Sequence, residues 1–499
     1  AAGVPRPDMS QSANIASHLT SMAARLPDQV AIHMARGPDA KAPDAFESIT
    51  FRELDAESDV IARGLIAFGI GQGVRTALMV KPGRDLFALT FALFKAGAVP
   101  VLIDPGIGLA SLKACLGRAA PAAFIGIPQA HAARRVLGWS PGTIDRCVTV
   151  GSRWFWGGAT LDEIRKLGES AGGPLPEVQP DDVAAVLFTS GSTGVPKGAV
   201  YRHRTFSAQV TEIQRMFGVR PGEVDVPTFP LFALFDPALG MTSVIPHMDA
   251  TRPARVHPPC VIDAANRFNA TTMFGSPALL NTVSRWGAER GARFNTMQRI
   301  MAAGAPMPAA VIRRMLAMLP DGATVYPPYG ATEALPVAVI PSRDILSETW
   351  ARTEEGAGVC VGTPVASLRV KVIAITDDPI ASWSEARELP VGEVGEVVVS
   401  GGQVTHEYLH DEENTRRSKI PDGSTLWHRM GDVGYFDVAG RLWFCGRKAH
   451  RVDHAGGRLY SVPAEEVFNT HPAVFRTALV AARVDGAVKP VLCVELEPG

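Results

Sequence analysis

The residues best suited to chemistry lie in one short stretch, Thr189-Ser-Gly-Ser-Thr-Gly-Val-Pro-Lys197. It follows an apolar run, Ala184–Phe188, that predicts a buried strand. Glycines let successive backbone N–H groups converge on phosphate oxygens, hydroxyl groups add donors, and a lysine supplies positive charge. We therefore predict a loop that binds the phosphates of ATP. Its members are Thr189, Ser190, Gly191, Ser192, Thr193, Gly194 and Lys197.

Two other interpretations of this loop fit the sequence less well. A flexible Ser/Gly linker is usually flanked by polar residues, whereas the chain continues here as apolar Gly198-Ala-Val200. The P-loop of NTPases requires G-x-x-x-x-G-K-[ST], a spacing that this sequence lacks.

The stretch Thr189–Gly198 resembles the phosphate loop of the adenylate-forming superfamily, T-S-G-S-T-G-x-P-K-G. That superfamily includes acyl-CoA synthetases, peptide-synthetase adenylation domains and luciferases. Further motifs follow in the family's order from about residue 50 to the end of the chain. The resemblance implies ATP and Mg²⁺ as cofactors and an acyl-adenylate as the first product.

A second motif, Tyr329-Gly330-Ala331-Thr332-Glu333, resembles the second ATP signature of this family. The resemblance implies that Tyr329 stacks on adenine, Thr332 donates to a phosphate and Glu333 binds Mg²⁺. Magnesium on phosphates keeps several waters and takes one or two protein carboxylates, which agrees with a single glutamate. The alternative for Glu333 is a solvated carboxylate in a loop.

Two stretches of small residues carry weaker signals. Gly304-Ala305-Pro306 resembles the strand end that passes beside adenine, and Gly275-Ser276 resembles a wall of the acyl pocket. Small residues at such positions also serve plain packing, so that alternative stays open.

A third motif contains Asp432 and Arg447. In the family, the aspartate accepts hydrogen bonds from both ribose hydroxyls, which suits a vicinal diol. The arginine contacts the nucleotide and ends the large domain. The alternative for Asp432 is a turn-capping role. The resemblance thus implies four catalytic residues: Thr189, Lys197, Thr332 and Glu333.

The sequence departs from the family pattern at several places. Ala233 replaces a histidine expected beside the reacting carboxylate, Ala449 replaces an aspartate at the hinge of the small domain, and Val452-Asp453 replaces a V-K pair. The family's catalytic lysine lies near the C-terminus of the small domain. No lysine here stands in the expected G-K context, and we expect that residue beyond the sequence shown.

The stretches 229–249, 330–337 and 352–364 are most similar to the β-lactone synthetases of bacterial olefin biosynthesis. This resemblance implies a long-chain 2-alkyl-3-hydroxy acid as substrate, whose own 3-hydroxyl attacks the adenylate. It also implies other enzymes of the same hydrocarbon pathway as partners. The runner-up is a fatty acyl-CoA synthetase or fatty acyl-AMP ligase, and a catalytically inactive nucleotide-binding protein is a third reading. The predicted acyl pocket comprises Phe232, Phe235, Met241, Gly275, Ser276 and Leu335.

Composition narrows the class of protein. The 499 residues are 46% hydrophobic, with 49 basic and 50 acidic residues and a net charge of −1, so nothing indicates a nucleic-acid partner. The six cysteines are scattered without a C-x-x-C pair, which argues against a disulfide framework or a zinc site. We find no apolar run long enough to span a membrane and no signal peptide, and we expect a cytoplasmic protein.

Alternating strands and helices must position these residues. Strands at 75–80, 99–103 and 122–127 alternate with helices at 85–97 and 109–119, and a second such series covers 202–318, so we predict parallel sheets. From Val359, short β runs predict a small β-barrel-like subdomain. We expect 151–180 to be an irregular connection. The predicted class is α/β, with two doubly wound subdomains and the β subdomain in a large domain, 1–447, and the start of a small mobile α+β domain, 448–499.

Overall fold

The computed structural model describes residues 13–104, 107–140, 142–189 and 196–497. Its contacts divide the chain into two compact units. The first unit contains residues 1–214 and 218–251, and the second contains residues 215–217 and 252–499. Helix α7 (His203–Phe217) crosses from one unit to the other along the chain.

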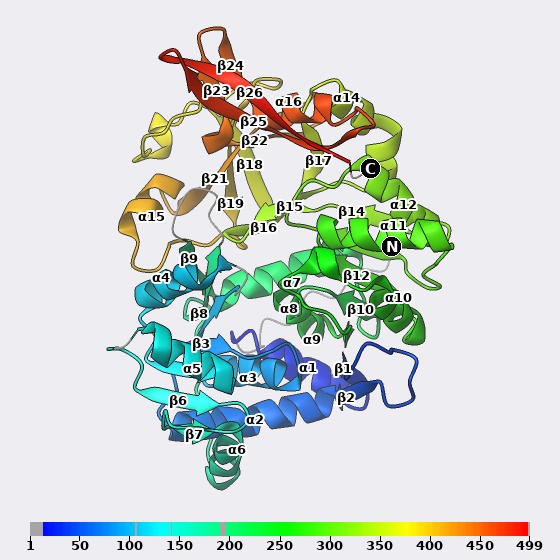
Figure 1. Ribbon diagram of the computed structural model, residues 1–499. Helices are drawn as coiled ribbons and strands as arrows, with labels where there is room; N and C mark the ends of the chain where they lie inside the picture. The colour runs from blue at the N-terminus through cyan, green and yellow to red at the C-terminus, as the bar shows by residue number, and fades with distance from the viewer. Residues whose placement is uncertain (1–12, 105–106, 141, 190–195, 498–499) are drawn as a thin grey trace, which may run out of the picture. The chain divides into compact units, whose positions relative to one another are not determined.

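A seven-stranded sheet forms the larger part of the first unit (Figure 1). Its strand order is β7 (Ala159–Thr160), β6 (Arg146–Thr149), β5 (Ala123–Gly126), β3 (Arg75–Met79), β4 (Val99–Ile103), β8 (Val183–Thr189) and β9 (Lys197–Arg202). All neighbours are parallel except β8 and β9, which form an antiparallel hairpin. The connecting helices are α2 (Phe51–Ala67), α3 (Arg84–Lys95), α4 (Leu109–Ala119), α5 (Pro128–Leu137) and α6 (Leu161–Ser170). Helices α3 and α4 pack on β4, and α5 packs on β5. This is the predicted parallel α/β arrangement.

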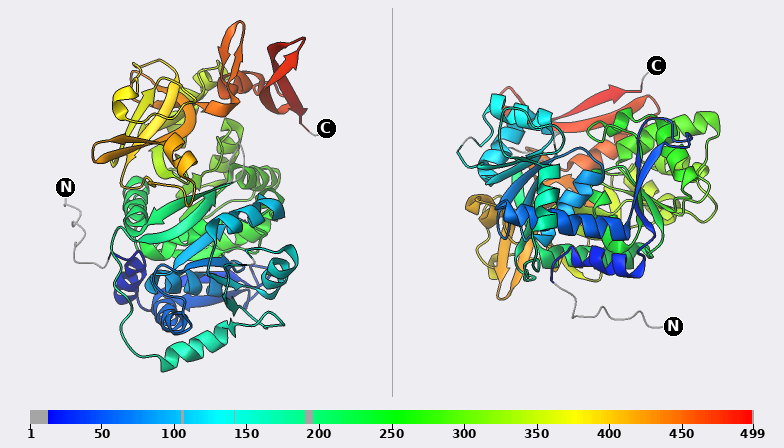
Figure 2. Two further views of the ribbon diagram at one scale, coloured as in Figure 1. Left: turned by 90° about the vertical axis from the view of Figure 1, so that its left-hand side faces the viewer. Right: turned by 90° about the horizontal axis from the view of Figure 1, so that it is seen from below.

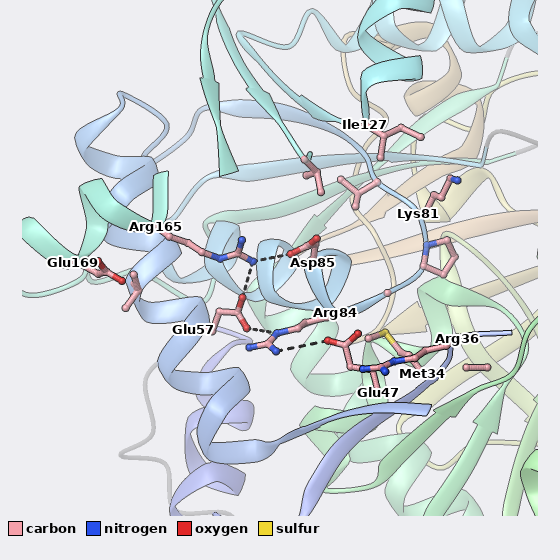
Figure 3. Close-up of a pocket in the computed structure, with 16 residues that line it drawn as sticks. Met34, Arg36, Glu47, Glu57, Lys81, Arg84, Asp85, Ile127, Arg165 and Glu169 are labelled. Carbon is pink, nitrogen blue, oxygen red and sulfur yellow. Dashed lines mark hydrogen bonds and ion pairs between the residues drawn. The ribbon is translucent and has the colours of Figure 1, made fainter. Parts of the chain in front are cut away.

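The order of the strands reverses beside β3, because the chain passes from β3 to β4 on one side and then to β5 on the other. A cavity of about 840 Å³ opens at this point (Figure 3). It is lined by the ion pairs of Arg84 with Glu57 (2.8 Å) and of Arg165 with Glu57 and Asp85 (both 2.7 Å). Acidic and basic side chains line it in equal number, so its charge selects neither an anion nor a cation.

The first unit also contains four neighbouring strands of the other seven-stranded sheet. Strands β10 (Val224–Pro227), β11 (Thr242–Ile245) and β1 (Val30–Ala35) pair in parallel, and β2 (Phe46–Thr50) pairs antiparallel with β1. Helix α1 (Ser17–Arg25) packs against the short α9 (Phe235–Leu239), which follows α8 (Pro230–Ala233).

The second unit begins with another α/β segment. Strands β12 (Thr272–Gly275), β13 (Arg299–Ala302) and β14 (Thr324–Tyr326) are parallel. They alternate with α10 (Pro258–Arg267), α11 (Pro277–Arg290) and α12 (Ala309–Met318). Because parallel strands end at one edge, Gly275 and Ala302 lie opposite each other at the carboxyl ends of β12 and β13.

An antiparallel sheet follows, and it stays open. Its main path is β15 (Tyr329–Ala331), β16 (Ala334–Val339), β17 (Val359–Pro364), β22 (Leu442–Arg447), β21 (Thr425–Phe436), β19 (Gly395–Gly401) and β18 (Leu368–Ile373), with β20 (Lys419–Asp422) paired to β21. Shorter helices, α13 (Ser342–Asp344), α14 (Trp350–Glu354) and α15 (Glu412–Ser418), connect its strands. The end strands β15 and β18 do not pair with each other in the described part of the chain, so the barrel-like closure that we expected is wrong.

The C-terminal stretch forms two further hairpins outside this sheet, coloured orange to red in Figure 2. They are β23 (Val452–His454) with β24 (Gly457–Leu459), and β25 (Val474–Val484) with β26 (Ala487–Leu496). Helix α16 (Ser461–Phe468) packs on β25 and β22. The domain boundary after Arg447, the last residue of β22, stays a prediction.

The expected irregular connection at 151–180 is wrong in its middle, where α6 forms. Thr160 caps this helix by accepting from the backbone N–H of Glu163, while the Glu163 side chain accepts from the Thr160 N–H. This reciprocal capping box satisfies two donors at the helix start.

Among the described residues, no helix is long and apolar enough to cross a membrane.

Candidate active site

The predicted phosphate loop connects β8 and β9. Thr189, the last residue of β8, pairs in register with Lys197, the first residue of β9. The antiparallel hairpin thus brings the two ends of the loop together, with the half-buried Lys197 at its base. The predicted contacts of Ser190, Gly191, Ser192, Thr193 and Gly194 lie outside the described residues.

The predicted adenine and ribose residues meet in the second unit. Asp432 on β21 pairs in register with Arg447 on β22, and Tyr329 comes from β15. The Tyr329 hydroxyl donates to Asp432 Oδ2 at 2.6 Å, and Arg447 Nη1 lies 2.8 Å from Asp432 Oδ1. Three residues that are far apart in the sequence therefore form one cluster, as a nucleotide site requires.

Asp432 is 3% exposed and retains a capacity to accept hydrogen bonds. Arg447 forms an ion pair with Oδ1, and this buried oxygen accepts no other hydrogen bond from the described residues. Burial raises the pKa of Asp432, while Arg447 and Tyr329 act in the opposite direction. A carboxylate oxygen has two lone pairs, so Oδ1 can also accept a hydrogen bond from a ribose hydroxyl.

Glu333 lies in the turn between β15 and β16, where its side chain is half-buried. Its Oε1 accepts a hydrogen bond of 2.6 Å from the hydroxyl of Tyr408. Its backbone carbonyl accepts from the N–H of Thr405 at 2.8 Å. Lys419 donates to the carbonyl of Thr405, and burial lowers the pKa of Lys419 to about 7 despite the attraction of Glu333 and Glu407.

The Glu333 carboxylate fits the role of a magnesium ligand. Oε2 makes no hydrogen bond to another described residue, so one oxygen stays open to an ion. No group of three or more His, Cys, Asp or Glu side chains in the described ranges is placed to hold a metal. A site with one carboxylate suits Mg²⁺ held mainly by phosphates and water.

The weaker motifs lie at strand ends of the second unit. The exposed residues Gly304, Ala305 and Pro306 follow β13 beside the end of β12, since the Ala303 N–H donates to Gly275 O at 3.3 Å. Gly330 lies in the β15–β16 hairpin, where an added Cβ would stand 2.9 Å from Ala334 O and force a shift. Thr332 and Ala331 are half-buried in the same hairpin.

The predicted acyl pocket residues fall in both units. In the first, the rings of Phe232 and Phe235 stand 6.3 Å apart and Met241 is 1% exposed. In the second, Ser276 accepts from the Leu279 N–H and caps α11, Gly275 ends β12, and Leu335 lies on β16. Each unit contributes some of the predicted residues, and that the two groups line one pocket stays a prediction.

The structure also reveals a buried carboxyl pair that the sequence did not indicate. Asp225 on β10 and Asp236 on α9 are both buried and each affects the pKa of the other, and Ser243 donates to Asp236. Burial raises the pKa of both carboxyls. Tyr408 and Lys419 were missed for the same reason, because residues that meet only through tertiary packing leave no local pattern.

Comparisons with known proteins agree with this geometry. Residues 19–409 match the family described as AMP-binding enzyme. The chain is 52% identical over 497 residues to an olefin beta-lactone synthetase of Xanthomonas campestris pv. campestris, covering 98% of this chain and 88% of that protein. It is also 52% identical over 498 residues to an olefin beta-lactone synthetase of Stenotrophomonas maltophilia, covering 98% and 89%.

A solved structure confirms the fold. An amide bond synthetase from Marinactinospora thermotolerans superposes with a TM-score of 0.78 at 22% identity, over 97% of this chain and 90% of that one. Together with the family match and the clustered motifs, these similarities show that the chain is an AMP-forming ligase that belongs to the AMP-binding, or adenylate-forming, enzyme family.

Proposed function

We propose that this enzyme converts a long-chain 2-alkyl-3-hydroxy acid into a β-lactone. The observation that carries the proposal is 52% identity, over nearly the whole chain, to two proteins named olefin beta-lactone synthetase. The substrate carboxylate attacks the α-phosphorus of ATP and pyrophosphate leaves. The 3-hydroxyl oxygen then attacks the acyl carbon, its proton is lost, and AMP departs as the four-membered ring closes.

The described residues support the first step by binding and orienting ATP. Lys197 and Thr332 would hold phosphate oxygens, Tyr329 would stack on adenine, and Asp432 would accept from the ribose through Oδ1. Arg447 is 46% exposed, so its side chain can move to a phosphate or ribose oxygen. Bound Mg²⁺ would stabilise charge on the phosphates, with Glu333 as its protein ligand. Positioning and charge stabilisation do most of the work in such a phosphoryl reaction.

The second step requires a dry site in which the substrate folds back on itself. The 3-hydroxyl oxygen must approach to about 3–3.5 Å from the acyl carbon. Phe232 and Phe235 supply apolar surface, and Ala233, which stands where the family pattern led us to expect a histidine, is completely buried. An imidazole is therefore absent where it could activate an external acceptor.

The test is to incubate the enzyme with ATP, Mg²⁺ and a 3-hydroxy acid, with and without coenzyme A, and to identify the products by NMR. We expect a β-lactone, AMP and pyrophosphate without coenzyme A, and no released acyl product from a fatty acid that lacks the hydroxyl. Turnover that requires coenzyme A and gives a thioester would instead identify an acyl-CoA synthetase. Accumulation of the adenylate alone would identify an acyl-AMP ligase.

A further inference from the structure

The segment 404–408, which follows β19, contacts both the main chain and the side chain of Glu333. Val404 forms a β-bridge with Ala334, and the Thr405 N–H donates to the Glu333 carbonyl at 2.8 Å. Tyr408, three residues further, donates its hydroxyl to Glu333 Oε1 at 2.6 Å. The segment therefore fixes the turn that carries Glu333 and also sets the direction of its carboxylate.

Tyr408 is itself held firmly. Its ring is 5% exposed, and its backbone N–H donates to Thr415 Oγ1 of α15 at 3.0 Å. Thr415 Oγ1 in turn donates to Asp411 O at 2.8 Å, which ties the start of α15 to the same loop. The buried Lys419 donates to the carbonyl of Thr405. These contacts hold the Tyr408 hydroxyl in one position, from which it donates to Glu333.

We propose that Tyr408 is a positioning residue that orients the Glu333 carboxylate for Mg²⁺. This inference rests on the proposed function, in which Glu333 is the magnesium ligand. The phenol occupies Oε1, so Oε2 would be the oxygen that binds the ion. Hydrogen bonds that orient a metal-binding carboxylate change metal affinity by about 10- to 100-fold when they are removed.

The chemistry of the phenol suits this role better than that of a cationic side chain. A lysine or arginine on Oε1 would neutralise the carboxylate and repel the cation that it must bind. A neutral hydroxyl fixes the carboxylate without cancelling its charge, and an O–H···O⁻ bond of 2.6 Å has the short length of a charge-assisted bond.

The test compares Tyr408→Phe with Tyr435→Phe. Both replacements keep the ring and remove one hydroxyl; the Tyr435 hydroxyl donates to Ala357 O at 3.1 Å, away from Glu333. Pyrophosphate release at saturating ATP gives the Mg²⁺ concentration for half-maximal rate. The shift in melting temperature on adding ATP with Mg²⁺, relative to ATP with EDTA, gives a readout that does not depend on turnover.

We expect Tyr408→Phe to raise the half-saturating Mg²⁺ concentration about tenfold or more. Excess Mg²⁺ should restore most of kcat, and the Mg²⁺-dependent melting shift should shrink, while Tyr435→Phe behaves as the unaltered enzyme. Equal effects of the two variants, or a kcat loss that excess Mg²⁺ does not restore, would show only a structural role and overturn the inference.

Glu333→Gln separates failure of the inference from failure of the proposed site. If Glu333→Gln raises the Mg²⁺ requirement and Tyr408→Phe does not, Glu333 is the ligand and Tyr408 does not position it. If neither variant changes the Mg²⁺ requirement, Glu333 is not the ligand, and both the site assignment and the inference fail.

Discussion

Asp432→Asn is the sharpest test of the nucleotide site. Asp432 Oδ2 accepts from Tyr329 at 2.6 Å, whereas Oδ1 forms an ion pair with Arg447 at 2.8 Å. Because a carboxylate oxygen has two lone pairs, a ribose hydroxyl can bind Oδ1 beside Arg447, and the second hydroxyl must share Oδ2 with Tyr329. Asparagine keeps the volume of the side chain but has one acceptor oxygen and no charge.

The size of the effect follows from these contacts. Tyr329 can still donate to the amide oxygen of asparagine, so the hydrogen bond lost is the one from ribose to Oδ1. A hydrogen bond to a charged group contributes about 1.5–3 kcal/mol, which corresponds to roughly a 10- to 150-fold rise in the KM for ATP. Arg447 loses its ion-pair partner but is 46% exposed, and water can solvate it, so the fold should persist.

Kinetics with ATP, 2′-deoxy-ATP and 3′-deoxy-ATP provide the assay. The unaltered enzyme should discriminate against at least one deoxy nucleotide, and Asp432→Asn should remove that discrimination while its melting temperature stays close to that of the unaltered enzyme. Burial raises the pKa of Asp432, so discrimination should also weaken as the pH falls and the carboxyl becomes protonated. Equal use of ATP and 2′,3′-dideoxy-ATP by the unaltered enzyme would refute the assignment.

Two stability predictions concern buried carboxylates away from the nucleotide. Glu396→Gln should lower the free energy of unfolding by about 3–5 kcal/mol, because it leaves Arg429, which is 3% exposed, without its counter-charge; Glu388→Gln, in an exposed ion pair, should cost less than about 1 kcal/mol by chemical denaturation. Asp236→Asn should flatten the pH dependence of melting. The raised pKa of Asp236 means that its stabilising proton is fully bound below the unfolded pKa and is lost as pH rises through the folded pKa. The unaltered protein should therefore lose more stability than the variant between pH 5 and pH 8, and parallel melting profiles would contradict this.

Much of the fold could be predicted because local sequence marks the element ends clearly. The strand Val99–Ile103, between Gly97 and Asp104, agrees with the structure to the residue. So does the helix Leu109–Ala119, which begins directly after Gly108. Proline restricts the backbone angles and glycine widens their range, so these residue types mark in the sequence where an element begins or ends.

The missed features have a different origin. Helix α6 was hidden by the surrounding glycines and charges, although its capping box, Thr160 with Glu163, was readable in the sequence. The Tyr408–Glu333 contact joins residues separated by 75 positions, and no periodicity connects them. Motifs therefore identified the acidic residues as candidates, while the groups that contact them could be found only from three-dimensional packing.

The partners of the acidic residues distinguish two kinds of carboxylate in the second unit. Glu396 is buried between Arg429 and Lys448, so its charge is balanced and its contribution is to stability. Glu333 and Asp432 each accept a 2.6 Å hydrogen bond from a tyrosine, and a neutral phenol leaves the negative charge available. Asp432 also forms an ion pair with Arg447, which is half exposed. A carboxylate that binds a cation needs orientation without neutralisation, and we propose that the Tyr408 hydroxyl provides this for Glu333.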